Sequence, residues 1–376
     1  MQIGVPREIG AGETRVAATP ETVKKFIGLG YQVVVEKEAG KAASYPDASY
    51  EEAGATLADT AATVKDADLV LKIGAPTSDE VANYKEGAIV LASFAPHLNE
   101  HFDAYAARKL TCVALELIPR ITRAQSSDIL SSQASLAGYK AVLVASNIYS
   151  GMFPMMMTAA GTIKPARVVV LGVGVAGLQA IATAKRLGAI VEASDLRPVV
   201  KEQVESLGGK WLDVPMSDEE KAKAAGTGGY AWRPSEQYMK DQADVVDKAV
   251  SKADIVITTA QIPGRKAPVL VKADTLAKMK AGAVLVDMAV SSGGNVEGSK
   301  VDENVVTDNG VTIVGIGNIP ATVATEASAL FARNILNFLQ PQHDAESKTL
   351  KLNREDDMVK PTLIVDAGVV NYQKPA

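Results

Sequence analysis

Apolar and polar positions alternate along this chain in a pattern that predicts two α/β units. Short apolar runs rich in Val and Ile end at Gly, Pro or Asp, and helical patterns separate them. The first set covers residues 2–6, 31–37, 68–73, 88–93 and 111–116, and the second covers 166–172, 189–195, 210–214, 253–260, 281–289 and 310–316. Strands that alternate with helices form parallel sheets with helices on both faces, so we expect two such sheets.

Two long helical patterns indicate how the units are joined. One lies within residues 127–151 and starts at a capping Ser127 or Asp128, and the other covers residues 325–339. The simplest arrangement has both helices joining the units, with the tail from Gln340 packed against the first. The fold class is then α/β, with two Rossmann-like, doubly wound parallel-sheet domains joined by long helices. We expect residues 1–127 plus 340–376 to form a discontinuous N-terminal domain, and residues 128–339 to form the second.

Two further segments depart from this pattern. Residues 215–242 are polar and contain several Gly, so we expect a mobile loop there, because loops of this length are usually functional or disordered. Residues 141–163 are uncharged and long enough to span a membrane, but polar residues, a Gly and a Pro interrupt them. This pattern favours a core helix that ends before Met155–Met157. We expect these three Met side chains to fill gaps in a core between the domains.

The composition restricts the possible partners. The 39 Lys and Arg residues stand against 44 Asp and Glu, which gives a net charge of -5 at pH 7. Because domains that bind nucleic acid usually carry a basic excess, we expect no nucleic-acid partner. Cys112, the single cysteine, lies in an apolar run and is expected to be a buried, reduced thiol, as in the cytosol. Pro6, Arg7 and Glu8 stand where a secretory signal would be apolar, and we expect neither a signal nor a metal site.

One glycine-rich turn carries a candidate binding site. Gly172, Gly174 and Gly177 follow an apolar strand and open a helix, and the next strand ends in Asp195. This is the complete dinucleotide-binding fingerprint: the turn needs Gly172, a pyrophosphate approaches the backbone at Gly174, and helix and strand pack closely at Gly177. Asp195 would accept hydrogen bonds from the adenosine ribose and repel a 2′-phosphate. We therefore expect NAD(H) rather than NADP(H), a preference that Arg197 would soften.

Several longer segments resemble a known family. IGVPREIGAGETRVAATPETV, PRITRAQSSDILSSQASLAGYKAV, GVGVAGLQAIATAKRLGA and LVDMAVSSGGN are together similar to the alanine dehydrogenase and pyridine nucleotide transhydrogenase superfamily. The match runs through almost the whole chain. RAQSSDILSSQ and FPMMMTAAGT resemble, more specifically, the NAD(H)-binding component of proton-translocating NAD(P) transhydrogenases.

The resemblance to alanine dehydrogenases can be checked at single positions. Arg15 and Lys72 match that family's substrate-carboxylate Arg and its Lys, but its catalytic His falls at Phe94 and its catalytic Asp at Ser291. His97, three residues beyond Phe94, is a weak substitute. Oxidation of an amino acid needs such groups, because a proton leaves together with the hydride. Hydride exchange between two nicotinamides needs none, so these differences favour transhydrogenation.

The resemblance also implies which residues contact the nucleotide. Arg120, Gln125 and Asp128 match a loop that, in transhydrogenases, lies against the nicotinamide and ribose at the face meeting the NADP(H) component. Tyr230 matches the tyrosine of a loop that closes over the nucleotide, and it completes the expected catalytic set. Alternatively, Asp128 only caps a helix and Arg120 forms a surface pair. The expected cofactor-binding residues are Arg120, Thr122, Gln125, Asp128, Ser131, Gly172, Gly174, Val175, Gly177, Asp195, Leu196, Arg197, Gly229, Tyr230 and Gln242.

The function implied by the resemblance is a Re/Si-specific, proton-translocating NAD(P) transhydrogenase, an oxidoreductase and translocase made of several subunits. This chain would bind NAD(H) and form a homodimer, while partner subunits would span the membrane and bind NADP(H). It would lie on the cytoplasmic side of the inner membrane through those partners. Two alternatives remain: an alanine-type amino-acid dehydrogenase, and a non-catalytic NAD sensor or scaffold. A scaffold would not need the loop with Arg120, Gln125 and Asp128.

Overall fold

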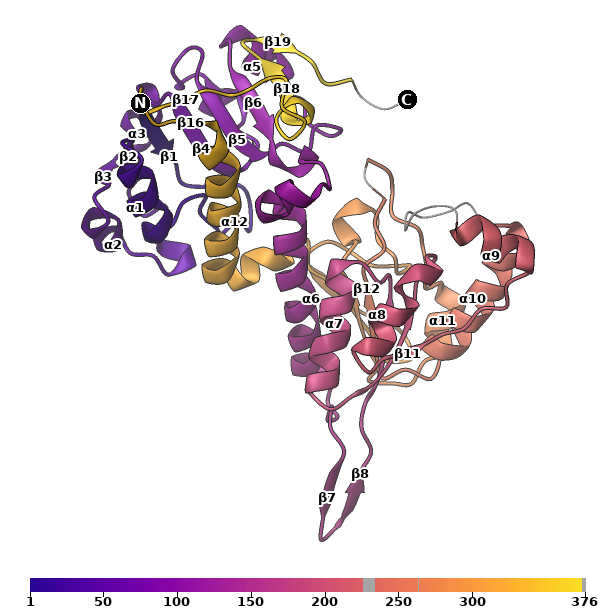
Figure 1. Cartoon of the computed structure of the whole chain (residues 1–376). Coiled ribbons are helices and arrows are strands. Elements are labelled where there is room, and N and C mark those ends of the chain that lie inside the picture. Colours follow the sequence, from indigo (N-terminus) through magenta and orange to yellow (C-terminus); the bar gives the residue numbers. More distant parts are fainter. Residues whose placement is uncertain (226–233, 263, 374–376) are drawn as a thin grey trace. The chain divides into compact units, whose positions relative to one another are not determined.

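The chain forms two compact units of α/β architecture (Figure 1). The computed structural model describes residues 1–225, 234–262 and 264–373. Unit 1 comprises Met1–Gln133 with Pro320–Ala376, and unit 2 comprises Ala134–Ile319. Each unit is built on its own, mainly parallel sheet, which confirms the predicted fold class. We describe the two units separately.

Unit 1 contains an eight-stranded sheet with the order β19-β18-β6-β5-β4-β1-β2-β3. Strands β1 to β6 are parallel, and the chain reverses direction in the sheet at β1, as in a doubly wound fold. The C-terminal β18 adds to β6 in the antiparallel direction. The strands are β1 (Gln2–Val5), β2 (Gln32–Glu36), β3 (Thr56–Ala58), β4 (Leu69–Gly74), β5 (Ile89–Ser93), β6 (Thr111–Ala114), β18 (Leu363–Asp366) and β19 (Val369–Val370), and β16 (His343–Asp344) pairs separately with β17 (Thr349–Leu350).

Helix α12 (Ala324–Leu339) belongs to unit 1, which corrects the expected domain boundary. The sequence placed this helix in the second domain. Its side chains Phe331, Ile335 and Phe338 are buried in the same core as the strands of unit 1, and this packing decides its place. The other helices of unit 1 are α1 (Pro20–Gly28), α2 (Asp47–Glu52), α3 (Thr60–Lys65), α4 (Ser78–Val81) and α5 (Phe102–Ala107).

Unit 2 contains a seven-stranded sheet with the order β11-β10-β9-β12-β13-β15-β14. All neighbours are parallel except β14, which pairs with β15 in the antiparallel direction. The strand order reverses between β9 and β12, and ligands of open α/β sheets bind at such a switch point. The strands are β9 (Arg167–Leu171), β10 (Ile190–Ser194), β11 (Lys210–Trp211), β12 (Ile255–Thr258), β13 (Val284–Asp287), β14 (Glu303–Val306) and β15 (Thr312–Gly315).

Some of the expected loop 215–242 is helical. Helix α9 (Asp218–Ala225) follows Ser217, whose hydroxyl accepts the backbone N–H of Glu220, and α10 (Glu236–Val250) is capped by Ser235. Such serine caps favour helix starts. The remaining helices are α6 (Ile129–Ile148), within which the boundary between the units falls, α7 (Val175–Arg186), α8 (Lys201–Ser206) and α11 (Ala273–Ala277).

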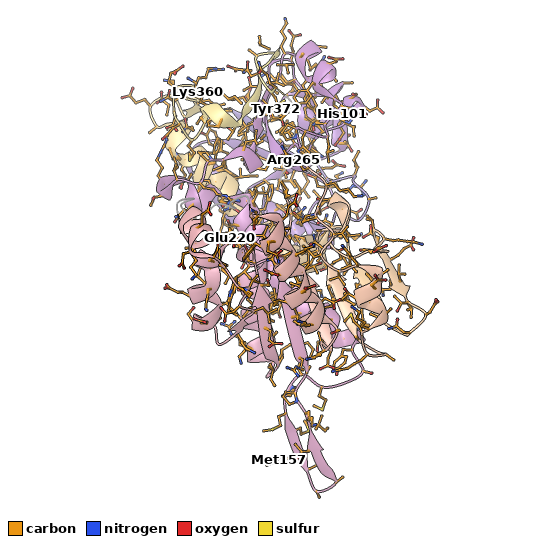
Figure 2. All side chains as sticks on the ribbon, turned by 90° about the vertical axis from the view of Figure 1, so that its right-hand side faces the viewer. His101, Met157, Glu220, Arg265, Lys360 and Tyr372 are labelled. Carbon is orange, nitrogen blue, oxygen red and sulfur yellow. The ribbon has the colours of Figure 1, made fainter. Side chains whose placement is uncertain are left out.

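Met155–Met157 lie on an exposed β-hairpin and do not fill a core, so that prediction is wrong. Strands β7 (Met156–Thr158) and β8 (Gly161–Ile163) pair with each other, and the Met157 side chain is 77% exposed. The hairpin projects from unit 2, and Figure 2 shows Met157 on it, away from the sheet of that unit. Among the described residues, no helix is long and apolar enough to cross a membrane.

Candidate nucleotide-binding site

The glycine turn between β9 and α7 has the geometry that its sequence predicts. Gly172 adopts a positive φ of 93°, and a Cβ atom at this position would lie 2.6 Å from the Thr259 hydroxyl oxygen. A Cβ at Gly177 would lie 2.0 Å from the Gly172 carbonyl oxygen. Gly174 is the N-cap of α7, and no atom lies within 4 Å of its Cβ position. The turn therefore packs tightly on one side and stays open at the helix N-terminus, where an anion is favoured.

Gly138 is a second glycine that this site requires, and the sequence analysis missed it. It lies in the middle of α6, where a Cβ atom would come within 2.1 Å of the carbonyl oxygen of Ala176 in the first turn of α7. Only glycine allows α6 to approach the start of α7 so closely. Val175, beside Ala176, has an exposed side chain at this helix start.

Asp195 follows β10 and is fixed to the glycine turn. Its Oδ2 atom accepts the backbone N–H of Val173 at 2.7 Å, and only 9% of its side chain is exposed. Burial alone would raise the pKa of Asp195, but hydrogen bonds from Arg197 and from the Val173 backbone outweigh burial and lower the pKa. The carboxylate is therefore ionised at neutral pH and held against the turn. Leu196 follows it, half-buried.

The loops after β12 and β13 are organised by two buried polar residues that the sequence analysis did not single out. Asp287 accepts the Thr258 hydroxyl and three backbone N–H groups, those of Ala289, Asn295 and Val296. The Asn295 amide in turn bonds both backbone groups of Ala260 and the carbonyl oxygen of Pro268. These bonds fix the loop backbones at the C-terminal edge of the sheet, where an α/β sheet binds its ligand.

The Arg120–Asp128 loop belongs to unit 1 and includes the 3₁₀ segment Thr122–Ser127. Arg120, Thr122 and Gln125 are exposed, and within the described part of the chain Arg120 has no ion-pair partner. By contrast, the neighbouring Arg123 pairs with Asp356.

Asp128 has the capping role that was the alternative interpretation. Its carboxylate accepts the backbone N–H of Ser131 at 3.0 Å and the Ser131 hydroxyl at 2.6 Å. Helix capping thus explains Asp128 and Ser131, but neither capping nor a surface pair explains Arg120.

Comparisons with known proteins identify the family. The sequence matches the alanine dehydrogenase/PNT N-terminal domain family over residues 4–137 and the corresponding C-terminal domain family over residues 141–373. The chain belongs to the alanine dehydrogenase/PNT family. The predicted resemblance is thus confirmed.

Within the alanine dehydrogenase/PNT family, the chain is more similar to transhydrogenase subunits than to alanine dehydrogenases. It is 51% identical to the first of the separate chains that make up NAD(P) transhydrogenase subunit alpha in Rhodospirillum rubrum, with 98% of this chain and 97% of that protein aligned. The crystal structure of a transhydrogenase from Sinorhizobium meliloti is 45% identical, with a TM-score of 0.89 over 98% of this chain and all of that one. The alanine dehydrogenase of Halomonas elongata is 30% identical, with 100% of this chain and 96% of that protein aligned.

The positions that the family's alanine dehydrogenases use for their substrate are otherwise engaged in this chain. Arg15 pairs side-on with Glu13 and also bonds Gln133, and Lys72 is fully buried between Glu8 and Glu80. Burial alone would lower the pKa of Lys72, but the two carboxylates outweigh it and raise the pKa. Lys72 is thus a structural cation in this structure, in place of the expected substrate contact.

The two proton-transfer positions hold groups that cannot act as bases. Phe94 is buried and packs edge-on against Tyr105. Ser291 donates its hydroxyl proton to the Gly317 carbonyl oxygen at 3.0 Å. His97 is half-buried, and no hydrogen bond orients its ring within the described part of the chain.

The remaining predicted contacts are less informative. Gln242 is half-buried on α10. Gly229 and Tyr230 lie outside the described residues. Among the residues that the structure describes, no three His, Cys, Asp or Glu side chains cluster in a way that could hold a metal ion.

Proposed function

We propose that this chain is the NAD(H)-binding subunit of an NAD(P) transhydrogenase, and that it positions NADH for hydride transfer to NADP⁺ on a partner subunit. The observation that carries the proposal is the pair of positions Phe94 and Ser291, where alanine dehydrogenases need proton-transfer groups. Sequence identity of 51% to a transhydrogenase subunit supports the same assignment. NADH supplies the hydride, and the protein supplies binding, orientation and exclusion of water.

The proposed roles follow from the local geometry. The open N-terminus of α7 at Gly174 holds the pyrophosphate, and Asp195 accepts the hydroxyls of the adenosine ribose. Arg120, Gln125 and Asp128 orient the nicotinamide. No base is required, because a hydride moves between two C4 carbons without a proton at the reacting centre. Misplacement of the reacting carbon by about 1 Å costs on the order of 100-fold in rate, so orientation is the main contribution expected from the chain.

The proposed partners are a subunit that binds NADP(H) and a subunit that spans the membrane and couples hydride transfer to proton translocation. This proposal rests on the family and on the similar protein from Rhodospirillum rubrum, whose name describes one portion of a subunit alpha. The chain would then lie on the cytoplasmic side of the inner membrane, held there by these partners.

A homodimer is included in the proposal, and the hairpin β7–β8 supports it. Met155, Met156 and Met157 are exposed there, and residues 151–163 carry no charge. Exposed apolar surface of this kind marks an interaction site. The α6 face with the exposed Tyr139 offers apolar surface in the same unit, so a two-fold pair could bury the hairpin of each copy on the other.

The experiment that tests the function mixes the purified chain with NADH and an NADP⁺-loaded nucleotide-binding component of a transhydrogenase. We expect NADPH to form only when both proteins are present. In a parallel assay, the chain with NAD⁺ and L-alanine should form no NADH above a blank. Alanine-dependent NADH formation at ordinary enzymatic rates, without exchange in the first assay, would assign the chain to the dehydrogenases instead.

A further inference from the structure

The guanidinium of Arg197 covers the carboxylate of Asp195. Its Nε atom donates to Oδ1 at 2.9 Å and its Nη2 atom donates to Oδ2 at 3.0 Å, which is a side-on, two-point ion pair. Nη2 also donates to the Val173 carbonyl oxygen at 3.2 Å, so the guanidinium also contacts the glycine turn. The Arg197 side chain is 28% exposed and reaches this position from the surface.

The hydrogen bonds of Asp195 leave no acceptor site for a ribose. An ionised carboxylate has about four lone-pair sites, two on each oxygen. Oδ1 accepts the backbone N–H and Nε of Arg197, and Oδ2 accepts the backbone N–H of Val173 and Nη2 of Arg197. The backbone donors are fixed by the fold. Only the guanidinium can leave, and it occupies one site on each oxygen.

A ribose diol matches what the guanidinium would release. Its two hydroxyl groups can replace Nε on one oxygen and Nη2 on the other, while both backbone bonds stay in place. The displaced guanidinium keeps its charge, because an Arg side chain does not lose its proton in proteins. Its Cα is two residues from Asp195, so after displacement it remains close to the 2′ position of the ribose. An Arg near this position is the usual ligand of a 2′-phosphate.

We propose that Arg197 is a latent 2′-phosphate ligand, and that its pairing with Asp195 sets the choice between NAD(H) and NADP(H). This inference rests on the proposed binding of NAD(H). Asp195 then acts in two ways: its charge repels a 2′-phosphate, and it holds the guanidinium that would attract one. Removal of Asp195 alone should therefore convert the site towards NADP(H), and this conversion should require Arg197.

A double-mutant cycle tests this proposal. NADH and NADPH affinities are titrated by nucleotide fluorescence on the wild type, Asp195→Asn, Arg197→Gln and the double variant. Asp195→Asn should weaken NADH and bind NADPH at least about tenfold more tightly than the wild type, which is the size of one charge-assisted hydrogen bond. The double variant should lose this gain. Arg197→Gln alone should increase the preference for NADH. Arg186→Gln, at an exposed position on α7, serves as the charge control and should leave the preference unchanged.

The outcomes separate this inference from the proposed function. Equal NADPH affinities in Asp195→Asn and in the double variant would show that Arg197 has no such role, even if NADH binds to the wild type. Wild-type protein that binds neither nucleotide would overturn the proposed NAD(H) role and this inference with it. Thermal melts of all variants identify a purely structural role for the pair, because such a role lowers the melting temperature without changing the ratio of NADH to NADPH affinity.

Discussion

The Asp287 carboxylate and the backbone N–H of Asn295 lie 2.9 Å apart, and this bond connects the end of β13 to the residue that holds the loop after β12. Both residues are fully buried. Asp287 accepts four hydrogen bonds in total, and the Asn295 side chain makes three. The edge of the sheet beside the glycine turn is thus shaped by two polar residues that need not touch a ligand.

The first prediction concerns the stability that Asp287 provides. Asp287→Ala should reduce the free energy of unfolding by about 3 kcal/mol or more, because it leaves buried N–H groups without an acceptor. Urea unfolding measures the change. The matched control is Asp302→Ala, which removes a bond to the Gly317 N–H at an exposed site and should cost well under half as much. Equal losses in the two variants would contradict the organising role of Asp287.

The second prediction concerns the contact between α6 and α7. Gly138→Ala should weaken NADH binding and lower the melting temperature, because its methyl group would overlap the Ala176 carbonyl oxygen and displace the start of α7. Gly28→Ala is the control, since no atom lies within 4 Å of a Cβ there. It should leave NADH affinity unchanged. Unchanged affinity in Gly138→Ala as well would show that the close contact does not shape the binding turn.

The third prediction concerns the single cysteine. Cys112 is buried on β6, and burial raises the pKa of its thiol. The reactive thiolate is therefore scarce at pH 8. We expect almost no reaction of the native chain with Ellman's reagent at pH 8, and one thiol per chain in guanidinium chloride. Rapid reaction of the native protein would show that β6 opens readily.

The fourth prediction concerns the β7–β8 hairpin. Replacing Met156 and Met157 together by Ser should weaken the proposed dimer, because it removes apolar surface from the interface. Sedimentation velocity over a range of protein concentrations measures the dissociation constant, which we expect to rise at least about tenfold. Met239→Ser on α10, also an exposed methionine, should have no effect. A wild-type chain that is monomeric at all concentrations would remove the homodimer from the proposal.

The parallel strands and the glycine turn were predictable because their signals are local. Apolar runs bounded by turn residues located most strands of both sheets, and the spacing of Gly172, Gly174, Gly177 and Asp195 identified the turn. The hairpin was missed because an apolar residue such as Met157 indicates burial only on average, and here no side chain of the same chain covers it. The caps Ser217 and Ser235 were legible signals of α9 and α10, which the polar composition of the segment obscured.

Other features of the site depend on contacts between distant residues. Nothing near Gly138 in the sequence indicates that Ala176 will approach it, and nothing near Asp287 announces its bonds to Thr258. The assignment of α12 to unit 1 likewise depends on which core its apolar face joins. The pairing of Arg197 with Asp195 is close in sequence, but the pattern alone does not distinguish an ion pair from an exposed arginine.

The most direct test of the proposed function compares Arg120 and Arg123 in hydride transfer. Both are exposed arginines of one loop, but Arg123 pairs with Asp356, whereas Arg120 has no ion-pair partner among the described residues. Stopped-flow exchange between NADH on the chain and NADP⁺ on its partner component gives the transfer rate, and equilibrium titration gives NADH affinity. We expect Arg120→Ala and Gln125→Asn to slow transfer by on the order of 100-fold while affinity changes only a few-fold, and Arg123→Ala to transfer at the wild-type rate. Wild-type transfer rates in Arg120→Ala and Gln125→Asn would contradict the proposed orienting loop and, with it, the main argument for a transhydrogenase.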